Sequence, residues 1–331
     1  MKLRRSSSAL FIWGVLLGAG CTVWGAPPGP AGAPVARAGS IRLLVEPDAG
    51  PAAVLDLISA ARRSVWAELY LLTDADAIAA LVGRARAGAD VRVLLEPALY
   101  QAETANQAAF AQLAAAGADV RWTTPRFTYT HAKVFTVDHT ALAVLTLNLT
   151  ASGLTGNREY AAVDTDPTDV AAMEVIFTAD QLGTPSPAPG GRLVTSPESS
   201  RATLLGLFDG ARASLAIETE ELADPQAVDA LLAARARGVA VTLAWPGPTA
   251  GAPATFASLA AAGATVRAVG APAIHGKVVV ADGGALYLGS ANLSATSLDA
   301  NREVGLRLDD PVLAARVAAT VMGDAATGIP P

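Results

Sequence analysis

The chain contains the same sequence unit twice, and this repeat constrains the fold more than any other feature. Three pairs of segments match at offsets that fall from 150 to 146 to 144: 64–81 with 214–231, 114–121 with 260–267, and 131–159 with 275–303. A repeat decides which folds a chain can adopt, and the falling offset indicates shorter loops in the second copy. We therefore expect a first lobe over 41–182, a linker over 183–191, a second lobe over 192–323 and a short tail over 324–331.

Each copy alternates strand and helix patterns. In the first copy apolar runs predict strands, and apolar residues at helical spacing predict helices. The expected strands are 41–46, 65–72, 91–96, 120–122, 132–137, 141–146 and 160–164, and the expected helices are 52–63, 75–87, 103–116 and 169–180. Strands that alternate with helices and end in a hairpin indicate an α/β fold with a mixed sheet flanked by helices. Two such lobes, related by a pseudo-twofold axis, would share an active site at their interface.

The composition supports two ordered lobes and says less about the substrate. The 331 residues are 52% hydrophobic and only 16% charged, which excludes disorder for most of the chain. The single cysteine excludes an internal disulfide and a cysteine-rich metal site. The net charge of −6 argues weakly against a surface built wholly for nucleic acid.

The amino terminus has the pattern of an export signal. Basic residues precede an apolar stretch over 9–19, and small residues and Cys21 follow, so residues 1–25 are predicted to be a signal peptide. Residues 18–21 resemble a bacterial lipobox, which would leave Cys21 lipidated; plain secretion and an uncleaved anchor are the alternatives. Residues 26–40, rich in Pro, Gly and Ala, read as a tether. All three alternatives place the body outside the cytoplasm, in a bacterial periplasm or at the cell surface. Removal of residues 1–21 deletes three basic residues and no acidic one, which changes the net charge from −6 to −9.

Three rare residue types gather in two matching clusters. The chain has three His, three Lys and five Asn, and the repeat holds two, two and four of them. The clusters are His131, Lys133, Asp138, Asn148 and 157–159 in the first copy, and His275, Lys277, Asp282, Asn292 and 301–303 in the second. In a chain of this composition, chance matches to H-x-K-x4-D number on the order of 0.002, so two in register indicate a function.

These residue types suit chemistry on a phosphodiester. A neutral imidazole can attack phosphorus, and a second, protonated imidazole can donate to the leaving oxygen. Residues two apart on a strand share a face, so each His points with its Lys. Two Lys and two Asn around the phosphate would take the place of a metal. Glu159 and Glu303 would orient the imidazoles. Asp138 and Asp282 lie at the hairpin turns and are interpreted as structural.

Both clusters resemble the H-x-K-x4-D-x6-G-S-x-N motif of the phospholipase D superfamily. The second copy fits at every position, and the first has Leu145 and Thr146 where the motif has Gly and Ser. The resemblance implies that the paired His, Lys and Asn side chains surround one phosphate, with no metal and no cofactor. It also implies that Thr146 and Ser290 lie near the phosphate, and that His131 is the nucleophile and His275 the acid and base. Leu145 would restrict the backbone near the phosphate and make the two halves unequal.

The sequence leaves the substrate open. The first hypothesis is hydrolysis of phospholipid head groups at a membrane surface, by a monomer that is an internal pseudo-dimer. A nuclease of the same superfamily is the alternative, if five Arg near the motifs line the cleft: Arg121, Arg126, Arg158, Arg267 and Arg302. Transfer to another alcohol, as in cardiolipin synthesis, would use the same intermediate. An inactive binding module is disfavoured because both motifs keep His, Lys and Asn.

Other polar and aromatic residues are interpreted more simply. Glu68 and Glu218 align late on a strand, and we expect a solvated or sheet-end position rather than one facing the cleft. The acidic pair 220–221 has no acidic counterpart in the first copy. Tyr129 is expected at the rim of the site, and His139 in a solvated turn.

Overall fold

The computed structural model describes residues 40–247 and 254–331. The predicted signal peptide, Cys21 and nearly all of the tether lie outside these described residues. Within the described ranges, no helix combines the length and the hydropathy that a bilayer span requires.

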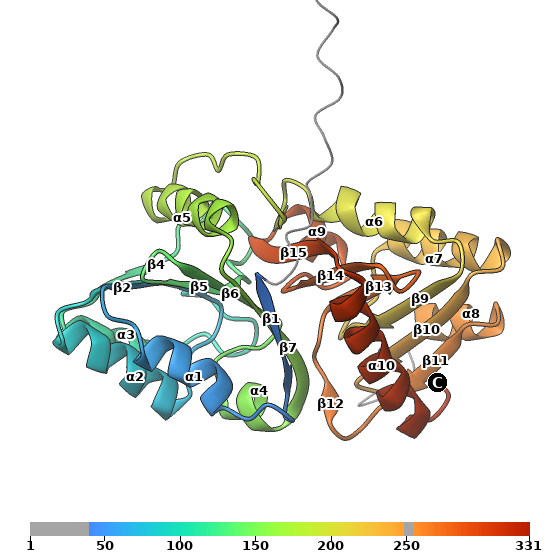
Figure 1. Cartoon of the computed structure of the whole chain (residues 1–331), viewed down its shortest axis with the longest axis horizontal. Coiled ribbons are helices and arrows are strands. Elements are labelled where there is room, and N and C mark those ends of the chain that lie inside the picture. The colour runs from blue at the N-terminus through green and yellow to red at the C-terminus, as the bar shows by residue number, and fades with distance from the viewer. Residues whose placement is uncertain (1–39, 248–253) are drawn as a thin grey trace, which may run out of the picture. The chain divides into compact units, whose positions relative to one another are not determined.

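The first lobe is built on an eight-stranded mixed sheet. Its own strands follow the order β1-β7-β6-β5-β2-β3-β4, with β2, β3 and β4 parallel and the others antiparallel. The strands are β1 (Ile41–Glu46), β2 (Ser64–Leu69), β3 (Asp90–Leu95), β4 (Asp119–Trp122), β5 (Lys133–Val137), β6 (Ala141–Leu145) and β7 (Asn157–Asp164). The helices are α1 (Ala52–Ser59), α2 (Ala75–Arg86), α3 (Gln107–Ala115), α4 (Ala151–Thr155) and α5 (Pro167–Leu182). Helices α1, α2 and α3 cover one face of this sheet, and α5 covers the other (Figure 1).

The second lobe repeats this architecture. Its seven-stranded sheet has the order β11-β10-β9-β13-β14-β15-β8. The strands are β8 (Leu193–Ser196), β9 (Ser214–Glu218), β10 (Ala240–Trp245), β11 (Thr265–Ala268), β13 (Val278–Ala281), β14 (Ala285–Gly289) and β15 (Glu303–Asp309). The helices are α6 (Ser200–Gly210), α7 (Pro225–Ala236), α8 (Ala254–Ala261), α9 (Ala295–Asp299) and α10 (Pro311–Thr327). The predicted fold class, two similar α/β lobes with mixed sheets, is confirmed.

Equivalent helices begin with equivalent caps, which explains why both copies start them at the same place. Asp74 and Asp224 each accept a hydrogen bond from the backbone three residues on, at the start of α2 and α7. Asp166 and Asp310 cap α5 and α10 by accepting from the backbone two residues on, Asp310 also from the third, and each is followed by a proline. An aspartate cap with a following proline is a strong start signal for a helix.

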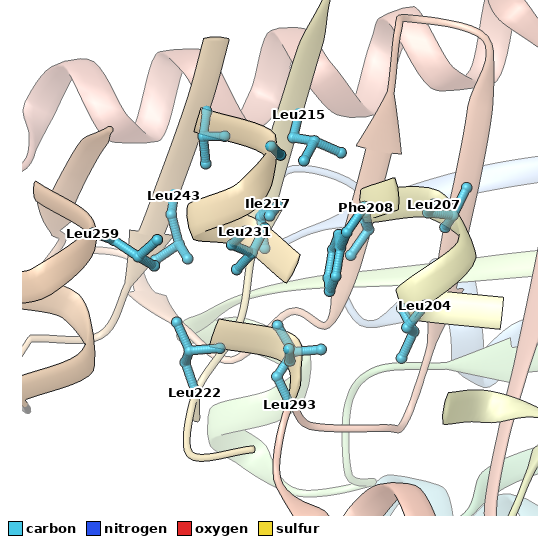
Figure 2. Close-up of a cluster of buried hydrophobic side chains, with 14 of the residues drawn as sticks. Leu204, Leu207, Phe208, Leu215, Ile217, Leu222, Leu231, Leu243, Leu259 and Leu293 are labelled. Atoms are coloured by element: carbon cyan, nitrogen blue, oxygen red, sulfur yellow. The ribbon is translucent and has the colours of Figure 1, made fainter. Parts of the chain in front are cut away.

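Hydrophobic residues form separate cores on the two faces of each sheet. In the second lobe, Leu and Phe side chains of α6 and α7 pack against Leu215 and Ile217 of β9 (Figure 2). A central core joins the lobes, because α5 and α10 and the inner faces of both sheets contribute to one cluster. This shared core is what allows a site to be built from both copies.

The backbone also crosses between the lobes at two equivalent places. Strand β12 (Ala273–Ile274), from the second copy, pairs in parallel with residues 157–158 of β7 in the first sheet. In the reverse direction, Thr130 forms a parallel bridge with Arg302. In each crossing, the residue directly before a motif histidine pairs with the residue directly before the motif glutamate of the other copy.

The solvated alternative for Glu68 and Glu218 is wrong, because both are buried, and both lie at or next to the end of their strands, β2 and β9. Each is 1% exposed, and neither lines the pocket described below. Burial raises the pKa of both carboxyls well above the usual value, and nearby Asp180 and Asp324, respectively, add to the effect. The apolar residues that precede each glutamate on β2 and β9 do not show, from the sequence alone, that the carboxyl is buried.

The raised pKa values predict a stability effect that depends on pH. The folded state is stabilised by the protonated carboxyl, and this contribution is complete at pH values below 4.5, the pKa in the unfolded chain. The contribution is lost as pH rises through the higher pKa of the folded state. Glu68→Gln is therefore expected to raise Tm at pH 8 by at least about 2 °C, since it removes the free-energy cost of enclosing a group that is ionised in the unfolded chain, and to leave Tm unchanged near pH 4. Thermal unfolding at both pH values measures the difference, with the exposed Glu103→Gln as control. A variant less stable than the wild type at pH 8 would contradict the prediction.

Candidate active site

Each motif histidine lies just before the first strand of a hairpin, β5 or β13, and two residues before its lysine. Lys133 opens β5, and Lys277 directly precedes β13. Each ammonium donates back to the carbonyl of its own histidine, at 2.7 Å for Lys133 and 2.6 Å for Lys277. Both lysines are buried beneath the histidines, as their spacing along one face predicts.

The motif aspartates anchor the hairpin turns. Asp138 accepts hydrogen bonds from the backbone N–H groups of residues 62–64, at 2.6–3.0 Å. Asp282 accepts from the backbone of residues 212–214 in the same way, at 2.7–2.9 Å. Both have a positive φ, a conformation that Asp tolerates better than most residues. These contacts hold the hairpin against the start of the neighbouring strand, β2 or β9.

The histidines and glutamates pair crosswise between the lobes. Nδ1 of His131 lies 3.0 Å from Oε2 of Glu303, and Nδ1 of His275 lies 2.5 Å from Oε1 of Glu159. The backbone crossings cause this exchange, because the amides of both histidines bond to the carbonyls of Arg302 and Arg158, which precede the glutamates. The sequence predicted that glutamates orient the imidazoles; the exchange between copies was not part of that expectation.

Thr146 and Ser290 lie outside the lining of the pocket described below, and their expected place near the phosphate stays a prediction. Both are completely buried behind the glutamates. Thr146 donates to Oε2 of Glu159 at 2.5 Å, and Ser290 donates to Oε2 of Glu303 at 2.6 Å. Their hydroxyls also accept from the backbone of the strands that carry those glutamates. A hydroxyl at this position therefore fixes the carboxylate that orients the imidazole, and Thr serves as well as Ser.

Protonation states follow from this arrangement. Burial alone would raise the pKa of Glu303, but His131, Lys133 and Ser290 lower it below its usual value. Burial would likewise raise the pKa of Glu159, and His275, Lys277 and Thr146 lower it. Burial lowers the pKa of His131, and Glu303 opposes the shift only in part. At neutral pH His131 is therefore a neutral imidazole whose Nδ1 is held by a carboxylate, which leaves Nε2 as the nitrogen with a lone pair to donate.

A pocket of about 690 Å³ opens above the two histidines. Its lining is polar and aromatic and draws on both copies: Tyr70, Tyr100, Tyr129, His131, Asn148, Glu220, Glu221, His275, Asn292, Ser294, Thr296, Ser297 and Asn301. The structure thus brings together both motif histidines and both motif asparagines, with Tyr129 at the same pocket. Lys133 and Lys277 lie just below, and burial lowers the pKa of Lys133 to about 7.

Four further groups complete the site, and the sequence analysis selected only Asn301 among them, as part of the second cluster. Ser297 and Asn301 both donate to Oε1 of Glu303, so this glutamate has more supporting donors than Glu159. Tyr70 packs its ring edge against His131, with ring centroids 4.5 Å apart. Glu220 contacts the second His–Lys pair. The offset of 150 aligns Tyr70 with Glu220 immediately beyond equivalent strands, and this placement beside the His–Lys hairpin was the signal that could have found them.

Leu145 alters the core and not the site, contrary to the expectation drawn from the motif. It is completely buried in the apolar core of the first lobe. In the second copy, a Cβ on Gly289 would come within 2.7 Å of the Tyr287 hydroxyl. The first copy has Ala143 at the position of Tyr287, so the phenol that crowds Gly289 has no counterpart beside Leu145. Leu145 therefore belongs to the packing of the first lobe.

The five arginines near the motifs do not line the pocket. Arg158 and Arg302 are buried in ion pairs with Asp324 and Asp180, respectively, at 2.6 and 2.7 Å. The other three bond elsewhere: Arg121 to Asp119, Arg126 to the carbonyl of Thr184, and Arg267 to the carbonyl of Val266. Among the described residues no set of three or more His, Cys, Asp and Glu side chains is arranged to hold a metal ion.

Comparisons with solved structures show that the fold is shared with known proteins. None of the curated protein sequences matches the chain. The chain superposes on phosphatidylserine synthase of Haemophilus influenzae Rd KW20 with a TM-score of 0.64 and 13% identity, over 87% of each chain. It superposes on polyphosphate kinase of Porphyromonas gingivalis with a TM-score of 0.69 and 16% identity, over 85% of this chain but only 46% of the kinase. Nuc, a phospholipase D family member from Salmonella typhimurium, matches 42% of this chain over 95% of its own length, with 25% identity and a TM-score of 0.38.

The family assignment rests on the sequence match across both copies. A family model described as "Cardiolipin synthase, PLD-like domain" matches residues 54–181 and 204–323, which is most of the chain. The two matched segments correspond to the two copies of the repeat, and each contains one complete His–Lys–Asp motif. The resemblance drawn from the motifs is thereby confirmed, and the chain belongs to the phospholipase D-like family.

Proposed function

We propose that this chain is a metal-independent phosphodiesterase that hydrolyses phospholipid head groups through a phosphohistidine. The observation that carries the proposal is the pair of histidines in one pocket, each held at Nδ1 by a carboxylate from the other copy. That arrangement leaves both Nε2 atoms for chemistry, one as nucleophile and one as proton donor.

The first step forms a covalent intermediate. Nε2 of His131 attacks phosphorus, the bond from phosphorus to the head-group oxygen breaks, and the proton on Nε2 of His275 passes to that oxygen. The free head group leaves, His131 carries the phosphatidyl group, and His275 becomes neutral. The lowered pKa of His131 supports its role, because only the neutral imidazole has the lone pair to donate.

The second step reverses the proton transfer. Nε2 of His275 takes a proton from water as the water oxygen attacks phosphorus, and the bond from phosphorus to His131 breaks. Phosphatidate leaves, and both imidazoles return to their starting states. Lys133, Lys277, Asn148 and Asn292 are assigned to the phosphate oxygens, whose charge grows as each bond forms. Glu159 and Glu303 orient the imidazoles and stabilise their cationic forms.

Charge around the pocket supports lipid over nucleic acid. Its lining includes Glu220 and Glu221 and, among the described residues, no Arg or Lys. Nucleic-acid affinity comes largely from cationic side chains that neutralise successive phosphates. An export signal, if functional, would bring the enzyme beside a membrane surface, and lipidation of Cys21 would tether it there. We propose that it works outside the cytoplasm as a monomer with an internal pseudo-dimer.

Transfer of the phosphatidyl group is the second candidate. The family model that matches both copies is described as cardiolipin synthase. An alcohol could take the place of water in the second step, with the same residues in the same roles. Hydrolysis and transfer differ only in which hydroxyl reaches the phosphohistidine.

One experiment compares these activities. The full chain is assayed with fluorescent phosphatidylcholine, with single-stranded DNA, and with phosphatidylglycerol as both donor and acceptor, all in EDTA. We expect phosphatidate from the first, lost in His131→Ala and in His275→Ala. Abolition by EDTA would contradict the metal-independent mechanism. DNA cleavage without lipid cleavage would overturn the lipid assignment, and cardiolipin in place of phosphatidate would establish transfer.

A further inference from the structure

The two halves of the pocket differ at one pair of equivalent positions. Tyr70 in the first copy and Glu220 in the second each lie beside a His–Lys pair. Tyr70 presents an uncharged ring, 4.5 Å from the His131 ring and 5.0 Å from Nζ of Lys133. Glu220 presents a carboxylate, with Oε2 at 3.0 Å from Nζ of Lys277 and 3.4 Å from Nε2 of His275.

The carboxylate of Glu220 occupies a position suited to a phosphate oxygen. Nζ of Lys277 and Nε2 of His275 are the groups that the proposed mechanism directs at a bound phosphate. One carboxylate oxygen within reach of both therefore stands where an oxygen of the substrate would stand. Lys277 and His275 hold the pKa of Glu220 far below its usual range, so this oxygen is anionic at any working pH.

A bound phosphate would have to displace this carboxylate. The side chain of Glu220 is 41% exposed, so it can turn toward solvent without disturbing the core. After displacement its negative charge stays close to the phosphate. Two anions a few ångströms apart repel in proportion to the product of their charges. A phosphomonoester, which carries nearly two negative charges at pH 8, is therefore repelled about twice as strongly as a phosphodiester, which carries one.

The first half of the pocket lacks this obstacle. The ammonium of Lys133 donates to the carbonyl of His131 and faces the ring of Tyr70. Glu303, the carboxylate that most affects the pKa of Lys133, is engaged with His131 and three hydroxyl and amide donors. A phosphate can therefore meet Lys133 and His131 directly, while the Lys277 side opens only when Glu220 moves.

We propose that Glu220 is a specificity-determining residue that makes the pocket favour phosphodiester monoanions over phosphomonoester dianions. This inference rests on the proposed function, since it assumes that a phosphate binds between the two His–Lys pairs. In hydrolysis the lipid product is a phosphomonoester, so Glu220 would also promote its release. The same charge disfavours substrates with several adjacent phosphates.

The test measures anion binding without turnover. Inorganic phosphate, mostly a dianion at pH 8, and dimethyl phosphate, a monoanion, are titrated calorimetrically into the full chain. Glu220→Gln is expected to bind inorganic phosphate about tenfold more tightly than the wild type, and dimethyl phosphate about threefold more tightly. Glu220→Tyr, which copies the residue of the other half, should change both affinities in the same direction.

The matched control is Glu221→Gln. It removes the neighbouring charge in the pocket lining, and among the described residues Glu221 forms no ion pair with Lys133 or Lys277. It should change both affinities less than twofold. Equal effects of Glu220→Gln and Glu221→Gln, or no gain in either Glu220 variant, would overturn the inference and leave the proposed function standing. If neither the wild type nor Glu220→Gln binds either anion, although thermal unfolding shows both to be folded, the phosphate site and both proposals are wrong.

Discussion

Replacing His275 with alanine is expected to slow turnover of an alkyl phosphodiester by about 10²–10⁴-fold, while an aryl phosphodiester is still attacked. The alkyl leaving group needs a proton from His275, and general acid catalysis contributes effects of this size. A nitrophenolate leaves without a proton, so His131 can still displace it. Without a base for the second step, the phosphoryl group should then remain on His131.

Single-turnover kinetics measure this outcome. His275→Ala should release about one equivalent of nitrophenolate per enzyme and then stop, and peptide mapping should find the label on the peptide that contains His131. His131→Ala should release none, because it lacks the nucleophile. A burst in His131→Ala, with label on the peptide that contains His275, would reverse the two roles while leaving the crosswise geometry intact.

Loss of the Arg302 side chain is expected to lower the free energy of unfolding by about 3–5 kcal/mol. The guanidinium is completely buried and bonds to Asp180 at 2.7 Å, to the carbonyl of Ser196 and to Glu198. Arg302→Met leaves the Asp180 carboxylate enclosed without its partner, and breaking one side of a buried pair has effects of this size.

The compensating change separates charge from packing. Adding Asp180→Asn to Arg302→Met should recover part of the lost stability, because the double variant no longer encloses an unpaired anion. Arg307→Met, at a half-exposed arginine paired with an exposed aspartate, should change stability by less than about 0.5 kcal/mol. Denaturant unfolding of the four proteins measures these differences. An Arg302→Met variant as stable as Arg307→Met would show that the buried pairs contribute no net stability.

The sequence predicted the fold well because its signals are local and doubled. Apolar runs and apolar residues at helical spacing occur at matching places in both copies, so each copy checks the other. The short elements α4, α9 and β12 were missed, because a few residues carry too little periodicity to be recognised. Strand β12 has only two residues and is a strand because of its partner in the other lobe.

The candidate site also has parts that local sequence signals predict and parts that depend on tertiary packing. His131, His275 and the motif asparagines could be recognised from the sequence, because rare residue types at matching positions of a repeat stand out even when the packing is unknown. The bonds from the Thr146 and Ser290 hydroxyls to the carboxylates thirteen residues further on could not be predicted, because only the fold brings these groups together. Glu220 was set aside because it lacks a copy in the first half, yet this difference is what distinguishes the two halves. The burial of Glu68 and Glu218 could not be predicted, because a position late on a strand does not show whether the side chain is enclosed.

The crossed backbone pairing has a consequence for how such a site depends on concentration. Neither copy holds a complete pair of histidine and glutamate, so a separated half could assemble the site only by finding another half in solution. Covalent fusion turns that encounter into an intramolecular event at a high effective concentration. The specific activity of the fused chain should therefore stay constant on dilution. Fusion also frees each half from having to recognise itself, and the unmatched pairs Tyr70 with Glu220 and Ala143 with Tyr287 are substitutions that a symmetric dimer of identical chains could not have accumulated on one side alone.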